Sequence, residues 1–180
     1  LEAGRYDCAL VVGAEMERHV PAAQAAAQMA TAAWAGRETE QATFCWPWLF
    51  DQLADEYDRR YGLDEEAMRD IARLNIDNAR RNPLAQTRDW QLSDRNYAVD
   101  EVHNPVVEGR MRKSDCGRFT DGASALVLVN DAGLKRLGRS AAGLAKIVGW
   151  GHTTGSLALS DKLELSEGED LIFPHVRDCI

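Results

Sequence analysis

Four cysteines and four histidines are the side chains of this chain best suited to nucleophilic catalysis or to metal binding. A cysteine thiolate attacks a carbonyl or thioester carbon, and a neighbouring histidine activates it as a base. Cys8, Cys45, Cys116 and Cys179 lie far apart, with no CxxC pair and no histidine at ligand spacing. Because a zinc site needs at least two ligands close together in sequence, we predict no metal. No secretion signal is present, so we expect the thiols to be reduced.

None of the cysteines has the electropositive surroundings that lower the pKa of a reactive thiol. Cys8 lies within an apolar run and is predicted to be buried and inert, while Cys45 lies among aromatic residues, where burial raises a thiol pKa. Cys116 is the most interesting of the four, but the neighbouring Asp115 disfavours its thiolate. His152 is interpreted as a satisfied polar group or an interface residue, since no nucleophile accompanies it. We therefore predict that this stretch carries no catalytic residue.

Short apolar runs predict the strands that position these side chains. The segment 6–15 (YDCALVVGAE) is short and rich in β-branched residues, which predicts a buried strand covered on both faces. The segment 121–131 (DGASALVLVND) has the pattern of a central strand approached closely by another group. A short helix at 131–138 and a further strand at 144–150 follow. Strands and helices together predict an α/β fold.

Helical signals fill the region between the first two strands. The alanine-rich segment 22–36 predicts a helix, and apolar residues recur at helical spacing in 50–62 and 65–80. Asp64 is placed to cap the last of these helices. We predict that the last two helices form an antiparallel pair. Periodicity then fades over 82–114, which predicts a long irregular excursion of the kind that is usually either functional or poorly ordered.

Charge and hydropathy exclude two classes of protein. The chain has 29 acidic and 21 basic residues, a net charge of −8, and no block of Lys and Arg, so a nucleic-acid partner is not expected. Apolar runs such as 125–129 are far too short to span a membrane. Without an export signal we expect a cytoplasmic protein. The last segment, 171–180, starts like a helix and stops without a capping residue, so we expect the chain to be a piece of a longer protein.

Four segments share a specific order and spacing: 7-DCALVVGAE-15, 54-ADEYDRRYGLDEEAMRDIARLNIDNARRNPLAQ-86, 115-DCGRFTDGASALVLVNDA-132 and 145-AKIVGWGHTTG-155. Together they resemble the thiolase superfamily, closest to the sterol-carrier-protein-type thiolases and their bacterial acetyl-CoA acetyltransferase relatives. The block at 115–132 is the most specific. The resemblance covers nearly all of the chain, which corresponds only to the central portion of a thiolase subunit.

The resemblance implies a particular fold, with thiolase-like αβαβα layers present in part and an inserted, mainly helical loop domain over the acyl-CoA site. Strands 7–13 and 121–130, distant in sequence, would lie side by side in one sheet. The implied division is residues 1–19 and 115–142 for the end of the amino-terminal half, 20–114 for the loop domain, and 143–180 for the start of the carboxyl-terminal half.

The resemblance also implies an activity, the Claisen or retro-Claisen thioester chemistry of an acyl-CoA thiolase or acetyltransferase. Coenzyme A would be a substrate, with no further cofactor. The family's nucleophilic Cys and its late His and Cys motifs are not found, so residues outside this chain would carry the chemistry. Implied partners are acyl-CoA or CoA, the remainder of the subunit, and further copies in a homo-oligomer. Two alternatives are a catalytically altered thiolase-like protein, such as a steroid side-chain carbon–carbon lyase partner, and a non-enzymatic acyl-CoA-binding module.

Candidate substrate-binding residues come from two places. Aromatic residues around Pro47 form either a wall of the acyl or pantetheine channel or a contact that pins the helical pair to the sheet. Basic residues before Cys116 either meet the CoA phosphates or form a solvated turn. In relatives a Ser associated with CoA contacts often stands where this chain has glycine, which leaves backbone groups free to approach. The candidates are Trp46, Trp48, Phe50, Arg112, Lys113, Gly117 and Phe119.

Overall fold

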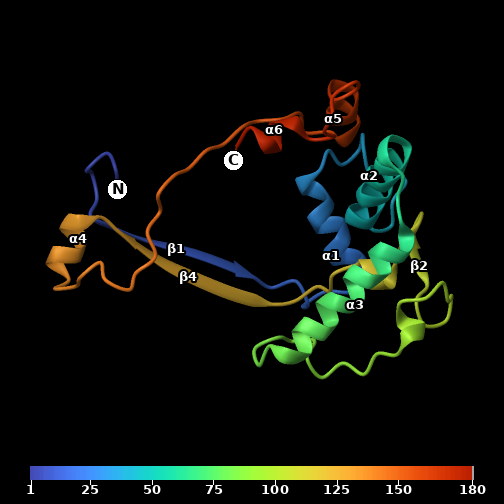
Figure 1. The fold of residues 1–180 in the computed structure, drawn as a ribbon, viewed down its shortest axis with the longest axis horizontal. Coiled ribbons are helices and arrows are strands. Elements are labelled where there is room, and N and C mark those ends of the chain that lie inside the picture. The colour runs from blue at the N-terminus through green and yellow to red at the C-terminus, as the bar shows by residue number, and fades with distance from the viewer. Residues whose placement is uncertain (180) are drawn as a thin grey trace.

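The structure is a computed structural model that describes residues 1–179. It contains both helices and strands, so the general α/β class is confirmed. A long two-stranded ribbon extends from a body of helices and loops (Figure 1). The elements are, in order, β1 (Cys8–Glu15), α1 (Ala22–Met29), the 3₁₀ helix η1 (Ala30–Ala32), α2 (Cys45–Tyr61), α3 (Glu65–Arg81), η2 (Asp94–Asn96), β2 (Val106–Glu108), β3 (Met111–Arg112), η3 (Lys113–Asp115), β4 (Gly122–Val129), α4 (Asp131–Arg136), α5 (Leu159–Leu165) and α6 (Pro174–Arg177).

The ribbon pairs two strands that are far apart in the sequence. β1 and β4 run antiparallel along their whole length, starting with Cys8 opposite Val129. At the other end, the backbone N–H of Arg18 donates to the Asp121 carboxylate at 2.9 Å, which ties the chain after β1 to the residue before β4. The prediction that these two segments lie side by side, with the helical region looped out between them, is confirmed.

Both faces of the ribbon are exposed, so the prediction of buried strands is wrong in the described part of the chain. Leu10 is 65% exposed and Val127 is 63% exposed. Cys8, expected to be buried, is exposed as well. The physical reason is that α4 packs at one end of the ribbon, and among residues 1–179 neither a third strand nor another helix covers the rest (Figure 1). Two strands alone cannot bury a face.

Residues 144–150 form no strand, which is a second correction. They are extended and exposed, and Val148 is 89% exposed. A strand needs a neighbouring chain to complete its ladder of hydrogen bonds. Within residues 1–179 no strand lies beside this segment, so its apolar sequence does not lead to pairing.

Helix α2 begins at Cys45 rather than at residue 50. Pro47 stands in its first turn, where the missing backbone N–H is not needed. The N–H of Phe44 donates to the Glu108 carboxylate at 2.7 Å and ties the start of the helix to β2. Gly62, with φ of 76°, ends the helix as predicted.

Helix α3 begins as predicted but packs differently. The Asp64 carboxylate accepts the N–H groups of Glu66 and Ala67 at 2.9 and 3.1 Å, so its role as the N-cap is confirmed. The predicted antiparallel pair with α2 is wrong, because α2 packs on α1, β2, β3 and α5, whereas α3 packs on η3. Helical spacing defines which face of each helix is apolar but not which neighbour that face meets.

The hairpin of β2 and β3 is fastened to α2 at its turn. The N–H of Arg110 donates to the Asp51 carboxylate at 2.7 Å. Asp51 is only 8% exposed, and Gly109, in the turn, lies directly against its carboxylate with φ of +50°. The hairpin leads into η3, so this contact helps to hold the segment that follows it.

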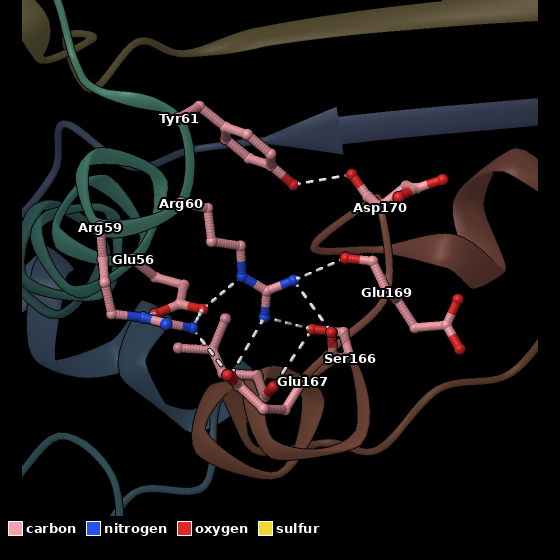
Figure 2. A network of polar contacts seen from close by, with 9 residues as sticks. Glu56, Arg59, Arg60, Tyr61, Ser166, Glu167, Glu169 and Asp170 are labelled. Atoms are coloured by element: carbon pink, nitrogen blue, oxygen red, sulfur yellow. Dashed lines mark hydrogen bonds and ion pairs between the residues drawn. The ribbon is translucent and has the colours of Figure 1, made fainter.

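The turn after α5 is held to the end of α2 by a group of polar contacts that we call the α2–α5 clamp: Glu56, Arg59 and Arg60 of α2 with Ser166 and Glu167. Figure 2 shows Arg60 reaching between Glu56 and the turn. Its guanidinium donates to the backbone oxygen of Ser166 at 2.9 Å and to its hydroxyl at 3.0 Å. Only 7% of the Arg60 side chain and 1% of Ser166 are exposed. The clamp therefore closes around a buried cation.

Acid is expected to weaken the clamp. Hydrogen bonds from Arg59 and Arg60 lower the pKa of Glu56 from 4.5 to about 2. A carboxyl group whose pKa is depressed by folding contributes stability above its unfolded pKa and loses it as the pH falls toward the folded value. The contribution of Glu56 is thus complete at neutral pH and declines between roughly pH 4.5 and pH 2.

Replacing Arg60 by Met is expected to release the turn after α5. The change keeps the aliphatic stem but leaves Glu56 and the buried oxygens of Ser166 without their shared donor. Since opened segments are cut in proportion to their population, we expect limited proteolysis within residues 157–172 to be at least about tenfold faster. Arg59→Met is the matched control, because the Arg59 side chain is 53% exposed and its loss should change cleavage little. Equal cleavage of both variants would contradict the role given to Arg60.

Candidate functional site

Asn104 organises the irregular excursion between α3 and β4. It is 1% exposed. Its side-chain amide donates to the Ala98 oxygen at 3.0 Å and to the Ser114 hydroxyl at 3.1 Å, and its side-chain oxygen accepts the Ser114 N–H at 2.9 Å. A buried amide with all these partners rigidifies the loops around it. Asn104 therefore fixes the position of η3, which carries Lys113.

The excursion and α3 together enclose a cavity of about 370 Å³, which we call the smaller cavity. Ile76, Trp90 and Leu92 supply its apolar wall. Its polar lining contains no carboxylate: it consists of Asn96, Tyr97, His103, Lys113, Ser114, Cys116 and Arg118. A concave site with one aromatic wall and several cations favours a ligand that combines a planar group with negative charge.

A second cavity, of about 800 Å³, lies where the excursion meets the end of the ribbon. We call it the larger cavity. Phe119 and Thr120 line it, together with the charged residues Glu17, Arg18 and Asp121. Trp90 and Arg118 line both cavities, and the Arg118 guanidinium lies 5.6 Å from the centre of the Trp90 ring. These two stacked side chains form the wall at which the two cavities meet.

The cations of the smaller cavity are not neutralised by the protein. Neither Lys113 nor Arg118 makes an ion pair with a carboxylate in the described part of the chain. Arg112, in contrast, donates to Glu101 at 2.8 Å and to the Asn104 oxygen at 2.9 Å. Two unpaired cations beside an indole ring can bind a phosphate group through charge-assisted hydrogen bonds.

The thiol in the smaller cavity is not activated. Burial raises the pKa of Cys116, and the charge of Asp115 raises it further, as the sequence predicted. Burial also raises the pKa of Cys45, again as predicted. A thiol with a raised pKa is a poor nucleophile at neutral pH.

The candidate substrate-binding residues divide into two groups. Lys113 lines the smaller cavity, Phe119 lines the larger one, and Gly117 lies exposed between Cys116 and Arg118. Arg112 is engaged by Glu101 and lines neither cavity. The aromatic residues of α2 line neither cavity: Trp46 and Trp48 are half-buried, and Phe50 is 58% exposed. The structure thus places the predicted residues Lys113, Gly117 and Phe119 along the two adjoining cavities, and it places the other four candidates elsewhere.

Most cavity residues were not predicted from the sequence, and Trp90, His103 and Arg118 are the most relevant of them for binding a ligand. Arg118 stands between two predicted residues, Gly117 and Phe119, so the sequence could have indicated it as a site residue. Trp90 and His103 lie in the stretch without periodicity, where only the folded backbone reveals which side chains converge. His152, in contrast, is exposed and stacks on Trp150 with ring centres 6.4 Å apart, away from both cavities.

Comparison of the chain with known protein families and with curated proteins finds no match to either. Among residues 1–179, no group of three or more His, Cys, Asp or Glu side chains is arranged to hold a metal ion. No helix in that part of the chain is long and apolar enough to cross a membrane.

Proposed function

We propose that the chain is the central part of a thiolase-type acyltransferase subunit and that its two adjoining cavities receive the CoA portion of an acyl-CoA. In this proposal residues 20–114 act as the loop domain over the substrate, and the ribbon belongs to a layered sheet completed by the remainder of the subunit. The sequence resemblance supports this proposal, and so does the pairing of β1 with β4 around the looped-out region.

The observation that carries the proposal is the path of residues 113–121. This segment leads from η3 into β4 and lines first the smaller and then the larger cavity. It contains the predicted residues Lys113, Gly117 and Phe119. A single ligand with a charged, planar end and a long flexible arm fits such a path, and an acyl-CoA has this composition.

The two cavities would divide the ligand by its chemistry. Lys113 and Arg118 offer charge-assisted hydrogen bonds to phosphate, and Trp90 offers a face for a planar base. Phe119 offers apolar contact to the pantetheine arm, and the exposed Gly117 lets backbone groups approach it. The thioester chemistry itself would be carried by a nucleophilic Cys and a His outside these residues.

Exposed apolar surface on the ribbon supports the proposed partner, the remainder of the subunit. Leu10, Val12, Leu126 and Val127 are each more than 60% exposed. Apolar strands of this kind are normally covered by neighbouring strands or helices.

Titration of the purified chain with CoA is expected to show binding with a dissociation constant in the micromolar range, measured by calorimetry. The same chain, incubated with acetoacetyl-CoA and CoA, is expected to release no acetyl-CoA, because Cys116 has a raised pKa. Absence of CoA binding would refute the proposed function. Turnover that disappears in Cys116→Ser would overturn the assignment of Cys116 as non-catalytic.

A further inference from the structure

His103 has one ring nitrogen whose state is determined by its surroundings. Its Nδ1 lies 3.0 Å from Oδ2 of Asp100. The N–H groups of Val102 and His103 donate to Oδ1 of the same carboxyl group at 2.8 and 3.1 Å, and these hydrogen bonds lower the pKa of Asp100. An ionised carboxylate only accepts hydrogen bonds. Nδ1 therefore carries a hydrogen whether the ring is neutral or charged.

The other nitrogen, Nε2, is then the one that would accept the second proton of the imidazole ring. In the neutral ring Nε2 presents a lone pair, which repels an anion, and in the charged ring it presents an N–H donor. The His103 side chain is 38% exposed and lines the smaller cavity. A phosphate in that cavity would meet a repulsive group at high pH and an additional donor at low pH.

The other ionisable groups that line the cavity are two basic side chains, a phenol and a thiol. Lys113 and Arg118 supply positive charge, and burial raises the pKa of Tyr97 and Cys116, which keeps both neutral. On the turn that carries His103, Asp100 is ionised, and Glu101 is ionised and paired with Arg112. Among the lining residues, His103 is therefore the one with an imidazole ring, the side-chain type that can serve as a proton-linked group at physiological pH.

We propose that His103 is a proton-linked ligand for the phosphate in the smaller cavity, so that anion binding draws one proton onto Nε2. This inference rests on the proposed function, because CoA supplies the phosphate. It makes CoA affinity dependent on pH through a residue that takes no part in thioester chemistry.

The test uses two anions and a pair of matched variants. Sulfate keeps a constant charge between pH 6 and pH 8, so it isolates the protein's own titration, while CoA tests the proposed ligand. Sulfate should bind about tenfold more weakly at pH 8 than at pH 6, since a charge-assisted hydrogen bond is lost. The phosphate of CoA itself gains charge over this range, so for CoA the expected result is a difference in pH dependence between the wild-type chain and His103→Gln. His103→Gln should bind sulfate equally at both pH values, and His152→Gln, changed at an exposed histidine outside both cavities, should keep the wild-type dependence.

The NMR resonances of the imidazole rings, followed against pH in the wild-type chain, provide a measurement that does not depend on whether the variants fold. Saturating sulfate should raise the midpoint of the His103 titration and leave that of His152 unchanged. An unchanged His103 midpoint, with CoA still bound, overturns this inference alone. Failure of CoA to bind at every pH overturns the proposed function, and with it the assignment of the phosphate to CoA.

Discussion

Gly109→Ala is expected to lower the free energy of unfolding by about 3 kcal/mol, which corresponds to a fall in Tm of about 10 °C for a chain of this size. Two costs add. A residue with a side chain at φ of +50° costs about 1 kcal/mol relative to glycine. The new Cβ would also overlap the buried carboxylate of Asp51, and overpacking of this kind costs about 2 kcal/mol. Thermal and urea unfolding measure the change.

Gly138→Ala is the matched control for this prediction. Gly138 has φ of +61°, and nothing lies within 4 Å of the position of an added Cβ. It should therefore show the backbone cost alone, about 1 kcal/mol. The double variant Asp51→Ala/Gly109→Ala should be less destabilised than the sum of its single variants, since the overlap disappears with the carboxylate. Equal effects of Gly109→Ala and Gly138→Ala would show that the α2 contact does not constrain the hairpin.

Lys113→Gln/Arg118→Gln is expected to weaken CoA binding by about a hundredfold. Each side chain offers a charge-assisted hydrogen bond worth about 1.5 kcal/mol or more, which is about tenfold in affinity. Neither cation has a carboxylate partner in the described structure, so its removal should leave no buried charge unpaired and should change Tm little. Calorimetric titration at low ionic strength gives the largest difference, because salt screens these contacts.

A second double variant controls for the loss of two positive charges. Arg139→Gln/Lys146→Gln makes the same change in net charge at exposed positions that line neither cavity. It should bind CoA within about twofold of the wild type, as expected for screened surface charges. Equal losses in the two double variants would mean that net charge, rather than the smaller cavity, determines CoA affinity.

Local signals in the sequence predict the individual elements of this fold well. The capping oxygen of Asp64, the proline in the first turn of α2 and the glycine after it all act within a few residues. The pairing of β1 with β4 is a long-range feature, and it was predicted through the resemblance rather than through periodicity. Burial of these strands was not predictable in the same way, because it depends on what packs against them.

The site residues that are neighbours in the sequence were predicted. Those that come together only in the folded structure, from separate loops, were missed. Lys113, Gly117 and Phe119 belong to one continuous segment, in which the basic residues before Cys116 indicate the first and the block 115–132 indicates the other two. Trp90 and His103 come from loops without a repeating pattern, and the buried Asn104, next to His103, ties its loop to Ala98 and Ser114 through hydrogen bonds that the sequence does not reveal. Trp46 and Phe50 show the opposite error, since aromatic character alone does not tell which neighbour a ring will contact.

Residues 157–172 are held firmly to α2 but only loosely to the segment that precedes them in the chain. The segment 139–155, which joins α4 to this region, is exposed and makes few backbone hydrogen bonds. It therefore constrains the position of α5 relative to α4 only weakly. Arg60, at the end of α2, in contrast donates hydrogen bonds to Ser166 in the turn after α5 (Figure 2). A shift of the end of α2 is therefore expected to carry α5 with it, because the Arg60 guanidinium bonds to the turn that follows α5.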